Sequence, residues 1–150
     1  MSHLTNLIDL AHETSSTKRR ELLRQVTGIF MTHPEDVGEA ELHLYDQVMS
    51  QLAADMETIV RAEIAQTLAG AKVAPLGLLR KLAVDEIEVA EPILTRSKAL
   101  SVDDLMHVVE TQGQGHLRAV SKREIVPEQV SGVIVKRGDD TTLHLSLIHI

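Results

Sequence analysis

The sequence predicts an all-α protein that folds as a short α-solenoid of about nine helices. Apolar residues recur at helical spacing along almost the whole chain, which is the pattern of amphipathic helices. A unit of about 25 to 27 residues repeats in the second half of the sequence. Aromatic residues make up 1% of the 150 residues and hydrophobic residues 43%, so we expect a packed core of aliphatic side chains.

The chain is predicted to form one domain over residues 1–140, and its first part, 1–56, is expected to hold N-terminal helices. The first helix is short, and its apolar positions are Leu4, Leu7, Ile8 and Ala11. A second helix is predicted over 17–31, with an N-cap offered by Ser15, Ser16 and Thr17. Pro34 ends it. A third helix follows from the apolar positions Leu42, Tyr45, Val48, Met49 and Leu52.

Residues 57–140 are predicted to form repeat units, each with a short helix, a turn, a longer helix and another turn. Residues 100–113 match residues 125–138 at a constant offset of 25, and Leu78 begins a similar match at an offset of 27. A single unit cannot bury its apolar face alone, so stacking of neighbouring units predicts the solenoid. The short helices are expected at Arg61–Ala69, ending before Gly70, at Val89–Arg96 and at Leu117–Arg123.

Prolines and capping residues mark the predicted helix starts. We expect every proline in the first turn of a helix, where its missing N–H is tolerated: Pro34, Pro75, Pro92 and Pro127. Ser101 and Asp104 have the spacing of a capping box. Residues 130–135 are rich in β-branched side chains and suit a strand by propensity, but their register with residues 105–109 favours a helix.

The central sequence resembles an uncharacterised family found mostly in alphaproteobacteria, domain of unknown function 2336. The resemblance covers roughly residues 3–140 and is most specific over 61–120. The short repeats also resemble leucine-rich-repeat-variant and HEAT-like units. The resemblance implies a helical-repeat protein with no assigned activity, and it brings no catalytic residues. The segments that carry it are RAEIAQTLA at 61–69, AP at 74–75, LLRKLAVD at 78–85, IEVAEPIL at 87–94, Ser97 and Leu100-Ser101.

The C-terminal residues 141–150 depart from this pattern. The family would continue into another helical unit, whereas here an apolar tail follows Asp140. Residues 145–150, Leu-Ser-Leu-Ile-His-Ile, resemble the translation of a sequencing-transposon end. We therefore expect a truncated or artefactual tail and a longer natural protein.

Composition and charge exclude several classes of function. The chain has no cysteine, which excludes disulfides, thiolate catalysis and cysteine-based zinc sites. Residues 1–13 lack the basic start of a secretory signal, and no apolar run approaches the ~20 residues that cross a bilayer. We therefore expect a cytoplasmic protein with no membrane contact. The net charge of −7 is concentrated over 31–90, which argues against a phosphate-binding surface there.

The histidines do not predict a metal site, and Ser15 does not predict a catalytic nucleophile. The pairs His33 with His43 and His107 with His116 lack the helical spacing of metal ligands. Ser15 has a lysine three residues later, as Ser–Lys nucleophiles have, but the accompanying motifs are missing. We therefore interpret Ser15 as a helix cap and expect neither a metal nor a cofactor.

The glycines and carboxylates of the repeat region are also interpreted as structural. Gly113 and Gly115 lack the third glycine and preceding strand of a dinucleotide loop, so they predict a turn between helices. A run of acids is expected on an inter-helix turn, where it stabilises the start of the next helix, and it consists of Asp85, Glu86, Glu88 and Glu91.

Basic residues supply the candidate interaction surface. One cluster lies on the second predicted helix and consists of Lys18, Arg19, Arg20 and Arg24. A second set would form a basic groove toward the C-terminal end, from Arg96, Arg118, Lys122 and Arg123. Such a groove suits nucleic acid, but the scarcity of aromatic side chains and the negative net charge argue against that partner.

The predicted architecture favours a non-enzymatic scaffold for protein–protein interaction or regulation, because solenoids present extended surfaces. A nucleic-acid-binding helical-repeat protein is the first alternative. An enzyme acting on a small ligand is the second, and it would need a deep pocket with convergent polar groups that the sequence does not indicate. The sequence identifies neither the partner nor the oligomeric state.

Overall fold

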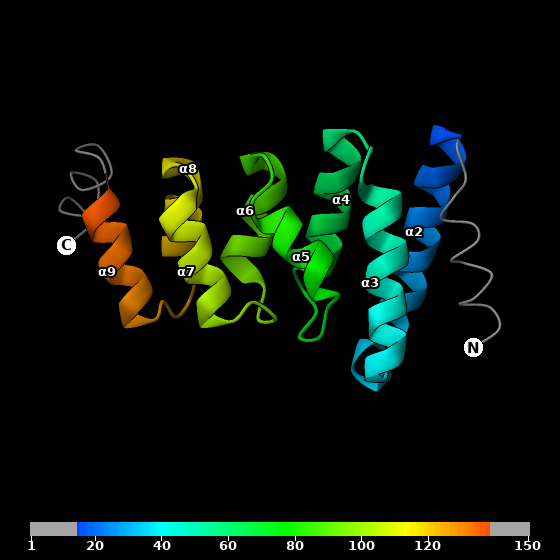
Figure 1. The fold of residues 1–150 in the computed structure, drawn as a ribbon, viewed down its shortest axis with the longest axis horizontal. Helices are drawn as coiled ribbons and strands as arrows, with labels where there is room; N and C mark the ends of the chain where they lie inside the picture. The colour runs from blue at the N-terminus through cyan, green and yellow to red at the C-terminus, as the bar shows by residue number, and fades with distance from the viewer. Residues whose placement is uncertain (1–14, 139–150) are drawn as a thin grey trace.

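The structure is a computed structural model that describes residues 15–138 of the 150 (Figure 1). Within that range it is all-helical, with eight α-helices, a 3-10 helix at Pro34–Asp36 and no strand, which confirms the all-α prediction for these residues. The predicted helix over residues 4–11 lies outside the described residues. The α-helices are α2 (Ser16–Thr32), α3 (Glu39–Ala53), α4 (Thr58–Leu68), α5 (Leu76–Ala83), α6 (Ile87–Arg96), α7 (Val102–Thr111), α8 (Gln114–Ser121) and α9 (Glu128–Arg137).

The helices follow one another in chain order along the long axis of the molecule (Figure 1). They form two rows, because most helices pack on the helix two places further along the chain. In the first row α2 contacts α4, α4 contacts α6, and α6 contacts α8. In the second row α3 contacts α5 and α7 contacts α9, whereas α5 and α7 barely touch. The second row is therefore nearly interrupted between α5 and α7.

Several helix ends follow the local signals that the sequence predicts. Ser15 is the N-cap of α2, and its hydroxyl accepts a hydrogen bond from the Lys18 N–H at 3.5 Å. Ser101 and Asp104 form the predicted capping box of α7. Pro75 and Pro127 are the N-cap residues of α5 and α9. Residues 130–135 lie in α9, so the repeat register predicted their state better than β-propensity did.

Two predictions about the helices are wrong. Pro92 lies inside α6 rather than in a first turn. Pro92 has no N–H to donate to the carbonyl of Glu88, so one hydrogen bond of α6 is missing. Pro92 is buried, however, and α6 packs against both α4 and α8, so the packing of the helix offsets this loss. The expected alternation of short and long helices fails in the first two units, because α4 has 11 residues and α5 has 8, while α6 and α7 have 10 each. It holds in the last unit, where α8 has 8 residues and α9 has 10.

The core is a continuous aliphatic cluster that runs from α2 to α9, as the composition predicts. Its one aromatic contact joins α2 to α3, where the rings of Phe30 and Tyr45 meet edge to face with centroids 5.3 Å apart. Among residues 15–138, the buried polar residues are Thr27 and Ser97. Each helix buries one face, and none within residues 15–138 is both long and apolar enough to cross a membrane.

Candidate interaction surfaces

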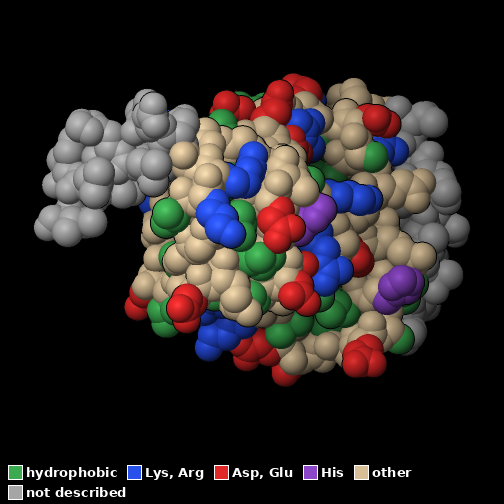
Figure 2. All heavy atoms as spheres, turned by 60° about the vertical axis from the view of Figure 1, so that its left-hand side comes forward, with side chains coloured by type: hydrophobic (Ala, Val, Ile, Leu, Met, Phe, Trp, Pro, Cys, Tyr) green, Lys and Arg blue, Asp and Glu red, His purple; other side chains and the backbone are tan. Residues whose placement is uncertain are grey.

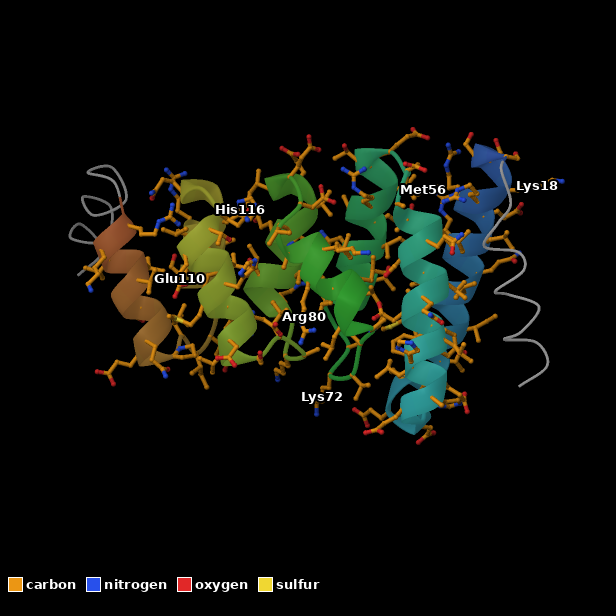
Figure 3. All side chains as sticks on the ribbon, viewed as in Figure 1. Lys18, Met56, Lys72, Arg80, Glu110 and His116 are labelled. Atoms are coloured by element: carbon orange, nitrogen blue, oxygen red, sulfur yellow. The ribbon has the colours of Figure 1, made fainter. Side chains whose placement is uncertain are left out.

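The basic cluster on α2 holds the first helices together. The Nη2 atom of Arg20 lies 2.5 Å from Glu57 Oε1, and Arg24 pairs with Glu63 through two hydrogen bonds of 2.7 and 3.0 Å. The hydrogen bond with Arg24 lowers the pKa of Glu63, against a smaller opposing effect of burial. Lys18 makes no side-chain bond within residues 15–138, and it points away from the helices (Figure 3). Of the four predicted contact residues on α2, only Lys18 is therefore left available.

Arginines from neighbouring segments cap the C-terminal ends of three helices. Arg19 donates to the carbonyls of the last turn of α3, including that of Gln51 at 2.5 Å. Arg123 donates to Leu94 O at 2.7 Å and to Ser97 O at 2.5 Å, at the end of α6. Arg137 donates in the same way to two carbonyls at the end of α7. Cations at these positions satisfy free carbonyls and the negative end of the helix dipole.

The acidic run at Asp85 is structural, but it is not confined to a turn as we expected. Asp85 accepts two hydrogen bonds from Arg61, of 2.7 and 3.1 Å, and one from the Glu86 N–H at 2.7 Å. Glu88 lies in the first turn of α6 and Glu91 in its middle. Hydrogen bonding to Asp85 raises the pKa of the Arg61 guanidinium. The carboxylate of Asp85 therefore ties α4 to the start of α6.

The other predicted features also have local roles. The ring Nε2 of His116 lies 2.8 Å from the carbonyl oxygen of Asp85, which links α8 to the turn before α6. Gly113 is the N-cap of α8, as expected for a turn between helices, whereas Gly115 lies inside α8, so the predicted turn holds for Gly113 alone. Within residues 15–138, no group of three or more His, Asp or Glu side chains is placed to hold a metal ion.

A cleft lies where the second row of helices is interrupted, and we call it the α5–α7 cleft. Its volume is about 310 Å³, and it is lined by Arg80, Lys81, Ala83, Val84, Leu100, Asp104, His107 and Val108. Half of the lining is apolar, from Ala83, Val84, Leu100 and Val108, and Val84 is 37% exposed. Arg80, labelled in Figure 3, bridges the cleft to Asp104 with an Nε–Oδ1 distance of 2.8 Å.

Asp104 is held ionised at this cleft. Burial favours the neutral carboxyl, but hydrogen bonds from Ser101 and Arg80 outweigh it and lower the pKa of Asp104. Both of its oxygens are engaged, since Oδ2 accepts from the Ser101 N–H at 3.0 Å. By contrast, the side chains of Lys81 and His107 are exposed and have no polar partner in the described part of the chain. The rim of the cleft thus offers uncommitted donors.

A second concavity lies beside the C-terminal ends of α6 and α8, and we call it the α6–α8 hollow. Its volume is about 790 Å³, and it is lined by Thr95, Arg96, Lys98, Lys122, Arg123, Glu124 and Ile125. Three of the four residues predicted to form a basic groove therefore line one hollow. Arg118 is not among the lining residues and lies exposed on α8. Lys98, in the loop that follows α6, also lines the hollow, and no sequence pattern marked it as a groove residue.

Positive charge does not gather into one broad patch. Figure 2 shows Lys and Arg side chains interspersed with Asp and Glu over the face that it presents. Five side-chain ion pairs join basic to acidic residues between residues 15 and 138. This mixture is typical of a solvated surface, so any recognition by charge must be local.

Comparison with known proteins places one similarity on the second half of the chain. Residues 89–147 match a family described as "Uncharacterised protein conserved in bacteria (DUF2336)". This is the family that the sequence resembles, but the match begins within α6, well after the predicted start of the resemblance. No curated protein and no solved structure matches. The chain is thus similar over residues 89–147 to a bacterial family whose description assigns no activity.

Proposed function

We propose that the chain is a non-enzymatic, cytoplasmic protein-interaction module, built as a short α-solenoid of HEAT-like helix pairs. The observation that carries the proposal is the α5–α7 cleft, which opens an apolar lining at a break in the second helix row. Exposed apolar surface bordered by polar residues is typical of contact sites for other proteins. The cysteine-free composition is compatible with a reducing compartment.

The contact pattern supports the solenoid part of the proposal. In a solenoid each unit contacts only its neighbours, and the chain advances along one axis. Here α4 contacts α2 and α6 in its own row, and α6 contacts α4 and α8. The helices also advance in chain order along the long axis (Figure 1). Repeated helix pairs of this kind present long surfaces without needing a catalytic centre.

The chemistry of the cleft supports a contact surface over an active site. A general acid or base needs a carboxyl whose pKa lies near the working pH. The pKa of Asp104 is instead lowered, and its oxygens are held by Arg80 and Ser101. The uncommitted groups are the exposed side chains of Lys81 and His107, which line the same cleft as the apolar residues Val84 and Leu100. This arrangement suits a partner segment that inserts an aliphatic side chain and places a carboxylate at the rim.

The proposal is tested by introducing a charge into the cleft. Partners are captured by crosslinking from a bacterial lysate treated with nuclease, identified, purified and titrated against three versions of the protein. Val84→Glu places a carboxylate on the apolar lining, and we expect it to weaken binding at least about tenfold. Ile59→Glu is the matched control, because Ile59 is 75% exposed and does not line the cleft.

Two results would overturn the proposal. The first is a partner that binds wild type and Val84→Glu equally well, which would remove the cleft from the interface. The second is the recovery only of nucleic acid, or of proteins that are lost on nuclease treatment. If Val84→Glu and Ile59→Glu both abolish binding, the loss is not specific to the cleft, and this result would also contradict the proposal.

Nucleic-acid binding is the second candidate, and one observation favours it. Arg96, Lys122 and Arg123 line the same hollow, together with Lys98. However, Arg96 already donates to Gln66 Oε1 at 2.8 Å, and Arg118 does not line the hollow. No aromatic side chain lines the hollow, so bases would find no stacking surface there. Binding to nucleic acid would fall steeply as salt rises, which separates it from contact through the cleft.

A further inference from the structure

The α6–α8 hollow carries an excess of positive charge that the described residues do not neutralise. Four of its lining residues are cationic and one, Glu124, is anionic. None of the ion pairs found within residues 15–138 involves any of the four cations. The side chains of Lys98 and Lys122 are exposed and make neither a hydrogen bond nor an ion pair within the same range. Two lysines are therefore free to bind an anion.

Arg123 also lacks an anionic partner within residues 15–138. Its guanidinium is partly buried, and among residues 15–138 it donates hydrogen bonds only to the carbonyl oxygens of Leu94 and Ser97. Burial lowers the pKa of Arg123, whereas a hydrogen-bonded carboxylate raises that of Arg61. A carboxylate delivered into the hollow would give Arg123 the partner that Arg61 already has.

An exposed aliphatic residue stands beside these cations. Ile125 lines the hollow and is 79% exposed, in the segment between α8 and α9. The hollow therefore combines a group of cations with one apolar contact. A peptide that carries carboxylates next to an aliphatic side chain matches both features.

We propose that the α6–α8 hollow binds an acidic peptide segment of a protein partner. Carboxylates of the segment pair with Lys98, Lys122 and Arg123, and an aliphatic side chain packs on Ile125. This inference rests on the proposed interaction function, but it concerns a site separate from the α5–α7 cleft.

The surroundings favour a peptide over a nucleic acid. A nucleic acid presents a long row of phosphates and needs basic residues along its whole path. The hollow is local, Arg118 does not line it, and the net charge of the chain is −7. A short acidic segment needs only the few cations that the hollow supplies.

The test uses defined probes and the full chain. A fluorescent peptide with four glutamates around one leucine is titrated by anisotropy at low and moderate salt. The same peptide with glutamines, and a single-stranded oligothymidylate, serve as comparison probes. Lys98→Glu combined with Lys122→Glu reverses the free charge of the hollow. Lys18→Glu combined with Lys72→Glu is the matched control, because both lysines are exposed and neither lines the hollow.

We expect the hollow variant to weaken binding of the acidic peptide at least about tenfold and the control variant less than about twofold. Ile125→Ser should weaken it several-fold without changing its salt dependence. Equal affinity of wild type and hollow variant, equal losses in both double variants, or tighter binding of the oligothymidylate would each overturn the inference. Because the probe is a synthetic peptide, such a failure leaves the result for Val84→Glu and the natural partner unaffected.

Discussion

Gly77, the second residue of α5, shows how a side chain of one helix can cap the start of the next helix in its row. The Asp46 carboxylate on α3 accepts hydrogen bonds from the N–H groups of Gly77 at 3.0 Å and Leu78 at 2.8 Å. A Cβ atom at residue 77 would lie 2.5 Å from Asp46 Oδ2. Gly77→Ala should therefore displace this cap and cost about 1 kcal/mol of unfolding free energy, despite the better helix propensity of alanine.

Gly132 provides the matched comparison for that prediction. It lies within α9, and a Cβ there would meet nothing within 4 Å. Gly132→Ala should therefore stabilise the protein by about 0.5–1 kcal/mol through helix propensity alone. Urea denaturation of both variants measures the two changes. Equal stabilisation by both alanines would contradict the capping role of Asp46.

At the scale of a helix, the capping box of α7 predicts a dependence of stability on pH. Hydrogen bonds from Ser101 and Arg80 overcome burial and lower the pKa of Asp104 in the folded state. A carboxyl with a lowered folded pKa stabilises the fold above its unfolded pKa, and this stabilisation is lost as pH falls through the folded value. Asp104→Asn should therefore cost about 1 kcal/mol at pH 7, and its cost should shrink in acid.

Asp103 gives the control for this effect. It lies in the same first turn of α7 but is exposed and has no hydrogen-bond partner within residues 15–138. Asp103→Asn should change stability only slightly at either pH, because the solvated charge interacts weakly with the helix end. The measurement is urea denaturation at neutral and acidic pH. A cost for Asp104→Asn that is independent of pH would show that its charge is not what stabilises α7.

The caps of several helices could be predicted from local sequence, whereas the helix lengths and the position of Pro92 could not. Ser15 and the Ser101–Asp104 pair act within one turn, so their capping roles are visible in the sequence. Pro92 was misplaced because its tolerance inside α6 comes from burial against other helices. The lengths of α4 and α5 also depend on packing, which the repeat pattern does not encode.

The candidate sites were less predictable, because their chemistry depends on contacts distant in sequence. Arg19 and Arg123 have the appearance of surface cations, yet they bind carbonyls 26 to 33 residues away. The α5–α7 cleft arises from a weak contact between two helices, which no motif marks. The cations of the α6–α8 hollow were partly predictable, because the predicted helical-repeat fold already placed Arg96, Lys122 and Arg123 in one basic groove.

At the scale of the whole molecule, the two-row arrangement predicts that stability is distributed along the chain. Within residues 15–138, helix α6 makes its main contacts with α4, α5 and α8, whereas α9 makes its main contacts with α7 and α8. In an array that has only neighbour contacts, a weakened helix lowers protection most in itself and in the helices that touch it. Amide hydrogen exchange under native conditions resolves such local differences, because each helix reports its own opening free energy.

Substitutions at two buried residues distinguish an array of helices that are coupled only to their neighbours from a single cooperative core. Leu94 on α6 and Val130 on α9 are both 0% exposed. Leu94→Ala should cost about 2–5 kcal/mol and raise exchange rates from α4 through α8, because it weakens the central contacts of the first row. Val130→Ala should cost about 1–2 kcal/mol and raise them in α7, α8 and α9 while leaving α2 to α4 unchanged. A uniform rise along the chain in both variants would contradict the neighbour-coupled array, and with it the solenoid on which the proposed function is built.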